Sequence, residues 1–199
     1  MAERADKAAF ITVNLVLLPV PFVPEVAIYT AHPGSGLARL GGPPPYWAYA
    51  WAGGAALARF VLDREGVRGR TVLDFGAGSG LVGIAAAKAG ARVFAVEADP
   101  WGRAAVAVNA AANGVSVALA ACKPDLVLCG DVFYGPEVAA RVLPLLDGFR
   151  AGGARVLVGD PGRADLPRAG LVLLAEVEVR DMGDGPDKTT LSGVYDYRP

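Results

Sequence analysis

The chain has 199 residues, of which 53% are hydrophobic, enough for one domain whose core covers both faces of a sheet. Its formal net charge of −1 argues against nucleic acid or an anionic membrane as a partner. The single histidine and two cysteines argue against histidine-based triads, a metal site and a disulfide framework. We therefore expect Cys122 and Cys129 to be buried, reduced thiols. The abundance of Gly, Pro, Ala and Arg is typical of a GC-rich bacterial genome.

Residues 1–45 contain an apolar run, 15–23, that is typical of neither a signal peptide nor a membrane span. Prolines interrupt it, and no small-residue cleavage site follows. We therefore expect a cytoplasmic protein, and we also expect a monomer. Residues 10–30 are predicted to be extended chain and strand, and the Pro- and Gly-rich stretch 31–45 a loop. This N-terminal segment would pack on a domain formed by residues 46–199.

The pattern of apolar residues predicts a helix over residues 46–63. The pair Gly53-Gly54 weakens its middle and indicates that another part of the chain approaches closely there. Trp47 and Trp51, spaced four residues apart, would share one face of this helix. Together with Tyr46 and Tyr49 they form either an aromatic core or a lid over a bound cofactor.

The stretch 71–97 predicts a strand, a glycine-rich turn, a helix and a second strand. The turn contains Gly76, Gly78 and Gly80, and the second strand ends at Glu97. In a βαβ unit of this kind the glycines let the backbone approach an adenosine-containing cofactor, and the second-strand carboxylate accepts hydrogen bonds from the ribose. A tight turn without a ligand is the alternative.

Two details distinguish this turn from a dinucleotide site. The spacing is G-x-G-x-G, with Leu81 where the dinucleotide motif needs its third glycine. An acidic residue, Asp74, precedes the turn, and a carboxylate there does not favour a pyrophosphate at a helix N-terminus. It does favour a cationic cofactor. The sequence therefore predicts S-adenosylmethionine as the cofactor.

The rest of the chain continues the alternation of strands and helices. We predict helices over 100–113 and 136–149, and strands over 92–97, 115–120, 125–129, 154–158, 171–180 and 188–197, the last two around a turn at 181–186. The predicted fold is therefore α/β: a Rossmann-like three-layer sandwich with a seven-stranded, mostly parallel sheet and an antiparallel last strand.

Polar residues follow two of these strands. Asp131 and Tyr134 come after strand 125–129, and Asp160 and Arg163 come after strand 154–158. Ligands of open α/β sheets bind at the carboxyl ends of strands, so Asp131 and Tyr134 are candidates for orienting an incoming amine, and the second pair is a candidate for the rim of the site. The alternative for Asp131 and Tyr134 is a helix cap and a packing tyrosine, and for the second pair a simple turn.

These motifs together resemble the seven-stranded, S-adenosylmethionine-dependent protein-lysine methyltransferases, whose hallmark is an acidic-x-x-Tyr motif, here Asp131-Val132-Phe133-Tyr134. More narrowly, the chain resembles the electron-transfer-flavoprotein β-subunit lysine methyltransferase family. The segments that carry this resemblance are 44–48 (PPYWA), 73–80 (LDFGAGSG), 130–134 (GDVFY), 158–163 (VGDPGR) and 188–190 (KTT).

The resemblance implies a role for each candidate residue. Asp131 and Tyr134 would be catalytic, with Asp131 orienting the amine more than accepting its proton. The cofactor would be bound by Trp51, Asp74, Gly76, Gly78, Gly80, Glu97 and Gly130. The substrate rim would consist of Tyr46, Trp47, Asp160 and Arg163. The implied product is S-adenosylhomocysteine, and the implied partner is the β subunit of electron transfer flavoprotein.

Two other functions stay open at this point. One is methylation of a small nicotinamide-like amine, since related sequences resemble nicotinamide methyltransferases. The other is a non-catalytic S-adenosylmethionine-binding module. The second is kept because two segments, the loop before Pro43 and residues 118–124, look shorter than in the family.

Overall fold

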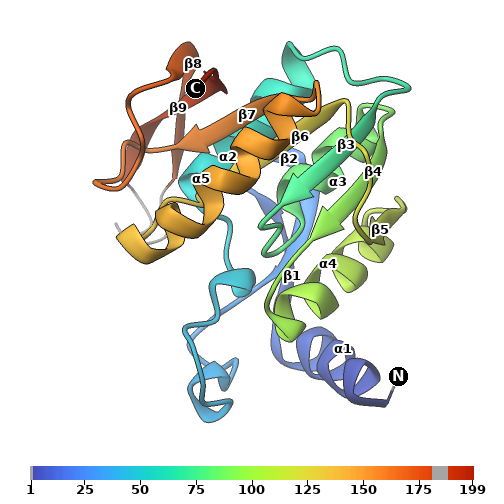
Figure 1. The fold of residues 1–199 in the computed structure, drawn as a ribbon. Coiled ribbons are helices and arrows are strands. Elements are labelled where there is room, and N and C mark those ends of the chain that lie inside the picture. The colour runs from blue at the N-terminus through green and yellow to red at the C-terminus, as the bar shows by residue number, and fades with distance from the viewer. Residues whose placement is uncertain (1, 181–187) are drawn as a thin grey trace.

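The computed structural model describes residues 2–180 and 188–199, and its main element is a seven-stranded sheet (Figure 1). The predicted turn at 181–186 lies outside the described residues. The strands of this sheet are β3 (Thr71–Phe75), β4 (Arg92–Val96), β5 (Val117–Leu119), β6 (Leu126–Gly130), β7 (Arg155–Asp160), β8 (Leu171–Arg180) and β9 (Thr189–Tyr197). Their order is β5-β4-β3-β6-β7-β9-β8. The first five run parallel, and β9 is antiparallel to both β7 and β8. The predicted sheet with an antiparallel last strand is confirmed.

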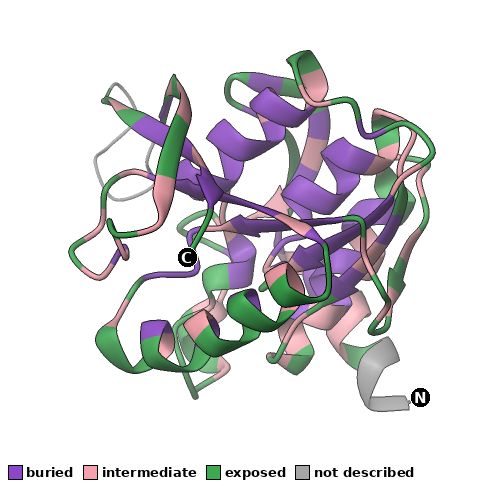
Figure 2. Ribbon diagram, turned by 45° about the horizontal axis from the view of Figure 1, so that its top comes forward, coloured by how far each residue is buried: buried purple, intermediate pink, exposed green. Residues whose placement is uncertain are grey.

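Helices cover both faces of the sheet. They are α2 (Ala52–Asp63), α3 (Leu81–Lys88), α4 (Pro100–Ala112) and α5 (Pro136–Ala151). Alternate residues of β6 point to opposite faces: Leu126 and Leu128 pack with α2 and α3, whereas Val127 and Cys129 pack with α5. Both faces are therefore buried, as Figure 2 shows for the central strands. This explains why the strand sequences are nearly continuous apolar runs.

The N-terminal segment differs from its predicted extended form. Residues Ala2–Asn14 form helix α1, which is followed by β1 (Val16–Val20) and β2 (Val23–Thr30), paired as a separate antiparallel sheet. The Ala-rich start of the chain has high helix propensity, which the prolines further along obscured. The segment is held on α4, where Asn109 Oδ1 accepts from Tyr29 N at 2.8 Å and Asn113 exchanges two bonds with the backbone of Ala27.

The helix predicted from residue 46 begins only at Ala52. Tyr46–Ala48 form a short 3₁₀ turn, η2, and Tyr49 and Trp51 have extended backbone angles. Trp47 and Trp51 therefore do not share a helix face. Trp47 stacks on Trp101 of α4 at 5.6 Å, while Trp51 lies on the other side of the break. Trp47 is buried against α4, whereas Trp51 is partly exposed and packs beside Tyr46 and Tyr49, so the two side chains have different surroundings.

The two thiols differ in burial: Cys129 is buried and Cys122 is partly exposed, so the prediction of a buried thiol holds for Cys129 alone. Within residues 2–180 and 188–199, no helix combines the length and apolar character needed to cross a membrane.

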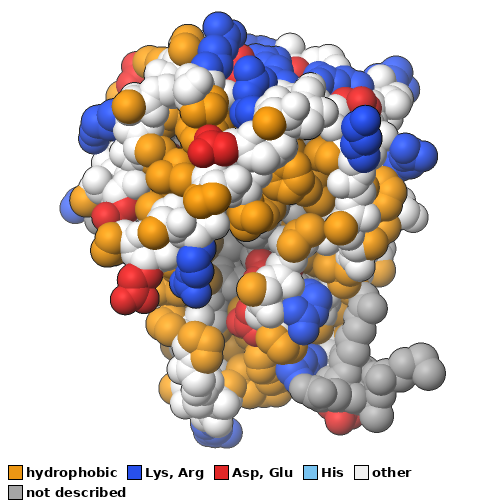
Figure 3. Space-filling view, viewed as in Figure 1, with side chains coloured by type: hydrophobic (Ala, Val, Ile, Leu, Met, Phe, Trp, Pro, Cys, Tyr) orange, Lys and Arg blue, Asp and Glu red, His pale blue; other side chains and the backbone are white. Residues whose placement is uncertain are grey.

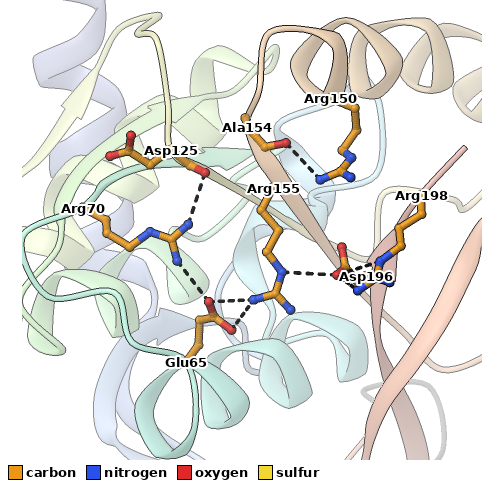
Figure 4. A network of polar contacts seen from close by, with 8 residues as sticks. All are labelled: Glu65, Arg70, Asp125, Arg150, Ala154, Arg155, Asp196 and Arg198. Carbon is orange, nitrogen blue, oxygen red and sulfur yellow. Dashed lines mark hydrogen bonds and ion pairs between the residues drawn. The ribbon is translucent and has the colours of Figure 1, made fainter.

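A network of ion pairs lies at the amino ends of β3 and β7 (Figure 4). Glu65, which follows α2, pairs with Arg155 at 2.8 Å and with Arg70 at 3.1 Å. Arg155 also contacts Asp196 of β9 at 3.3 Å, and Arg198 contacts the same carboxylate at 2.8 Å. These contacts join α2, β7 and β9 at the end of the sheet opposite the candidate site.

Candidate active site

A cavity of about 720 Å³ lies at the carboxyl ends of β3, β4 and β6, where their polar residues were predicted to meet. Its walls come from these strand ends, from η2 with the prolines before it, and from α5. Seen from the direction of Figure 1, hydrophobic side chains gather over the middle of this face, with separate charged side chains among them (Figure 3). A mostly apolar cavity with a few convergent polar groups is the usual form of a cofactor site.

The glycine turn forms one wall of the cavity. Gly76 and Gly78 line it, and both have positive φ angles, 69° and 52°. A Cβ atom at Gly76 would lie 3.0 Å from Val132, so a side chain there would crowd the wall. Gly80 does not line the cavity. Its φ is 81°, and a Cβ atom would approach Val106 of α4 at 3.3 Å, so this third glycine serves helix packing.

Glu97 points its carboxylate at the same turn. Its Oε2 accepts from Gly78 N at 2.7 Å, and its Oε1 accepts from Asp99 N at 2.8 Å. Gly102 of α4 leaves room for this side chain, because a Cβ atom there would lie 2.6 Å from Glu97 Cγ. Each carboxylate oxygen can accept one further hydrogen bond. The two oxygens therefore suit a vicinal diol at the cavity wall.

Asp74 does not line the cavity, contrary to its predicted cofactor contact. Its side chain points to the α3 face of the sheet, where Oδ2 accepts from Gly83 N at 2.8 Å, and the residue is 1% exposed. Burial raises its pKa to about 7, against the opposing effect of the Gly83 bond. Asp74 thus supports the turn from behind by holding the first turn of α3.

Asp131 is positioned by a close approach of α2 to the sheet. The α2 backbone packs on the ends of β6 and β7, since a Cβ at Gly53 would overlap the Gly159 carbonyl and a Cβ at Gly130 would lie 2.7 Å from Gly54 Cα. The predicted close approach at Gly53-Gly54 is confirmed. Asp131 has a left-handed φ of 55°, and its Oδ2 accepts from Gly54 N at 2.7 Å.

Arg163 completes the surroundings of this carboxylate. Its Nη2 donates to Asp131 Oδ1 at 2.7 Å, and its guanidinium carbon lies 5.8 Å from the centroid of a Trp51 ring. Burial raises the pKa of Asp131 to about 6, although Arg163 acts in the opposite direction. Asp131 does not cap α5, whose N-cap is Gly135, so the capping alternative for that helix is excluded.

Asp160 lies below this pair and outside the cavity. It is fully buried, and its Oδ1 accepts from Gly162 N and Arg163 N, both at 2.7 Å. Burial raises its pKa. Asp160 therefore shapes the loop that presents Arg163, rather than forming part of the rim itself.

Aromatic side chains surround the mouth of the cavity. Tyr46 contacts both Trp51 and Tyr134, with ring centroids 5.7 and 5.3 Å apart, and Trp51 Nε1 donates to Tyr46 O at 2.8 Å. Tyr46 and Tyr134 are 45% and 54% exposed, so the mouth opens at the surface. Tyr134 is thus not a packing residue of the core. Trp47, 3% exposed, touches the cavity but mainly packs on α4.

The apolar wall of the cavity was not predicted from the sequence. Val138, Val142 and Leu145 of α5 line this part of the cavity, together with Phe75 and Val96 at the strand ends. Their spacing of four and three residues places the α5 side chains on one face of the helix, which is the signal that identifies them. This apolar wall suits a flat, weakly polar group such as a purine base.

The residues present fit S-adenosylmethionine. The turn at Gly76 and Gly78 admits a ligand close to the backbone, the Glu97 carboxylate can accept hydrogen bonds from ribose hydroxyl groups, and the aromatic rings of Tyr46 and Trp51 suit a cationic sulfur. Gly130 lies at the base of the cavity between these groups. The described residues contain no cluster of three or more metal-binding side chains.

Comparisons with known proteins define the class. The family model described as ribosomal protein L11 methyltransferase (PrmA) matches residues 55–132. The solved structure of the ribosomal protein L11 methylase of Lactobacillus delbrueckii subsp. bulgaricus is similar, with a TM-score of 0.50 and 23% identity over 71% of this chain and 76% of that one. So is magnesium protoporphyrin IX methyltransferase of Synechocystis PCC 6803 with bound S-adenosylmethionine, with a TM-score of 0.50, 17% identity and the same coverage. The chain therefore has the fold of the class I methyltransferases.

Curated relatives narrow this class. The electron transfer flavoprotein beta subunit lysine methyltransferase of Rattus norvegicus is 37% identical over 172 residues, which are 78% of this chain and 68% of the relative. The protein of the same name from Mus musculus is 36% identical with the same coverage. The chain belongs to this family of lysine methyltransferases, as its motifs predicted. Both relatives are mammalian, so they do not support the bacterial source that the composition suggested.

Proposed function

We propose that this chain methylates the ε-amine of a lysine in the β subunit of electron transfer flavoprotein. The observation that carries the proposal is the open aromatic mouth, which leads from the surface at Tyr46 and Tyr134 to the Asp131 carboxylate. An open mouth of this kind admits a side chain that stays attached to a protein surface. The similarity to the mammalian relatives, whose names specify this substrate, supports the same choice.

The residues of the chain contribute mainly alignment and exclusion of water. When bound, S-adenosylmethionine supplies a methyl group on a positively charged sulfur. Glu97 would hold the ribose hydroxyls, and the backbone at Gly76 and Gly78 would lie against the rest of the nucleoside. Tyr46 and Trp51 would flank the apolar stem of the lysine, while Asp131 would accept a hydrogen bond from its amine. These residues would place the amine with its lone pair toward the methyl group that the cofactor would supply.

The decisive assay compares purified flavoprotein β subunit, free lysine and nicotinamide as acceptors, with mass spectrometry of each. We expect methylation of the flavoprotein, because only a protein acceptor gains binding energy from contacts around the mouth. Methylated nicotinamide beside an unmodified flavoprotein would show the small-molecule activity instead. Binding of S-adenosylmethionine with no turnover on any of the three acceptors would favour the non-catalytic module.

The control for this assay is Glu97→Gln, which removes the charge that meets the ribose while keeping the shape of the side chain. It should lose methylation of the flavoprotein at low cofactor concentration and regain part of it at high concentration.

We further propose that the protein acts as a monomer in the cytoplasm and binds no nucleic acid. The net charge of −1 supports the last point.

A further inference from the structure

The Asp131 carboxylate is held in a pair with Arg163, and this pair faces the cavity. Arg163 donates to the same oxygen, Oδ1, from Nη2 at 2.7 Å and from Nε at 3.2 Å. Its backbone N–H is fixed by Asp160, and its guanidinium lies over a Trp51 ring. The second oxygen of Asp131 accepts from Gly54 N. The guanidinium is therefore held at a defined place, next to the group that is to meet the substrate amine.

A buried carboxylate without this partner would oppose methyl transfer. The amine must attack through its lone pair, and a lysine with a pKa of about 10.4 is almost fully protonated at neutral pH. An isolated anion within hydrogen-bonding distance favours the ammonium form and raises the pKa of the amine further. A lone carboxylate at this position would thus bind the substrate well in its unreactive form.

We propose that Arg163 is a positioning residue that lets Asp131 bind the substrate amine without holding it as an ammonium ion. The inference rests on the proposed lysine methylation at this site. Paired with Arg163, Asp131 belongs to a unit of zero net charge, yet its Oδ2, which accepts only from Gly54 N, can accept a further N–H. The nearby guanidinium disfavours a second cation. The ammonium proton leaves to solvent water before attack, and neither Asp131 nor Arg163 takes it up.

Without Arg163, the substrate ammonium itself would take the place of the guanidinium beside Asp131. Its deprotonation would then separate an ion pair and move to higher pH. Other charged or titratable side chains lie near the pair or line the same cavity, and they stay unchanged in the comparison below. They are Asp160 at the end of β7, Arg168 on the following loop, Tyr134 after β6, Tyr46 on η2, Glu97 at the end of β4 and Arg141 on α5.

The test measures kcat against pH for four proteins acting on the flavoprotein β subunit: wild type, Arg163→Gln, Arg163→Lys and the double variant Arg163→Gln/Asp131→Asn. In Arg163→Gln the rising limb of the profile of kcat against pH should shift to higher pH by about one unit. Turnover at pH 7 would then fall about tenfold and recover at high pH. Arg163→Lys should keep the wild-type limb. The double variant should return the limb toward wild type, since no unpaired carboxylate remains. A rate loss in Arg163→Gln that is equal at every pH would overturn the inference.

A second measurement needs neither substrate nor cofactor. Carboxyl NMR titration of Asp131 should give a higher pKa in Arg163→Gln than in wild type, because the guanidinium stabilises the ionised form. The matched control is Arg168→Gln, an exposed arginine on the same loop, which should leave this titration unchanged. An unchanged titration in Arg163→Gln would show that the pair is not formed, and it would overturn this inference but not the proposed function. If the titration shows the pair in wild type but the flavoprotein stays unmodified, the proposed function is overturned instead.

Discussion

The two ends of the sheet both carry partly buried ion pairs, but they use them differently. At the amino ends of the strands, Glu65, Arg155 and Asp196 join α2, β7 and β9, and none of them lines the cavity (Figure 4). At the carboxyl ends, Asp131 and Arg163 form part of the cavity wall. The amino-end network connects elements of the fold, whereas the carboxyl-end pair presents charge to a ligand.

The backbone around the two clusters explains this difference. At the amino ends, the long side chains of Glu65 and Arg155 reach between elements. At the carboxyl end, α2 approaches β6 and β7 so closely at Gly53 and Gly159 that backbone atoms nearly touch. The Gly54 N–H therefore reaches Asp131 directly, and the carboxylate is fixed by one backbone donor and one guanidinium. A site built this way is expected to lose activity, rather than stability, when its charge is removed.

Asp131→Asn should break the carboxyl-end pair with the largest effect. The amide keeps an oxygen for Gly54 N–H but no longer balances Arg163, so the amine would meet an uncompensated cation. We expect kcat/KM for the flavoprotein to fall about 100-fold, comparable to removing one preorganised polar group from an active site. Binding of S-adenosylmethionine, measured by calorimetry, should change much less. An equal loss of cofactor affinity would make Asp131 a cofactor ligand.

Glu97→Ala should act on the cofactor alone. In the proposed binding mode the carboxylate would accept from both ribose hydroxyls, and charge-assisted hydrogen bonds contribute about 1.5–3 kcal/mol. The dissociation constant for S-adenosylmethionine should therefore rise about tenfold or more, while the thermal unfolding midpoint of the ligand-free protein changes little. Unchanged affinity by calorimetry would remove Glu97 from the site.

The sequence was sufficient to predict a seven-stranded, mostly parallel sheet with an antiparallel last strand. Continuous apolar runs such as Leu126–Gly130 have no polar face, so they require cover on both sides, and the glycine turn fixes the parallel connection. It was also sufficient to place Glu97, Asp131 and Arg163 at one edge, because the carboxyl ends of parallel strands meet there.

What the sequence did not predict depends on side-chain direction and on distant contacts. Whether Asp74 faces the cavity or α3 depends on which face of β3 each helix covers, and no local pattern states this. The pairing of Asp131 with Arg163 joins residues 32 positions apart through a loop held by Asp160. The break before Ala52 reflects the packing of Trp47 on Trp101, a contact between residues 54 positions apart in the chain.

Asp74 offers a contrast to the ion-paired carboxylates at both ends of the sheet. It is buried without a cationic partner among the described residues, and the effect of burial on its pKa outweighs the opposing effect of the Gly83 bond. Its pKa is raised to about 7 in the folded protein, above its value in the unfolded chain. The folded state therefore holds the proton more tightly, and the contribution of Asp74 to stability is lost as pH rises from about 4 to 7. The free energy of unfolding of wild type minus that of Asp74→Asn should fall over this range, by at most about 1.4 kcal/mol per pH unit. Denaturant titrations at pH 4.5, 6 and 7.5 measure it, and a flat difference would contradict the raised pKa.

Glu65→Gln should have the smallest effect of these variants, and the effect should be on stability rather than on activity. Glu65 is nearly buried and pairs with Arg70 and Arg155, but both arginines are about a third exposed, so solvent screens much of the attraction. The amide keeps part of the hydrogen bonding, and we expect a loss of about 1 kcal/mol in the free energy of unfolding, measured by denaturant titration. The matched control, Glu176→Gln, replaces an exposed glutamate on β8 and should change stability by less than about 0.5 kcal/mol. Cofactor affinity and the pH dependence of turnover should stay at wild-type values in Glu65→Gln. A change in either would mean that the amino-end network is coupled to the site, and the division of roles between the two ends of the sheet would then be wrong.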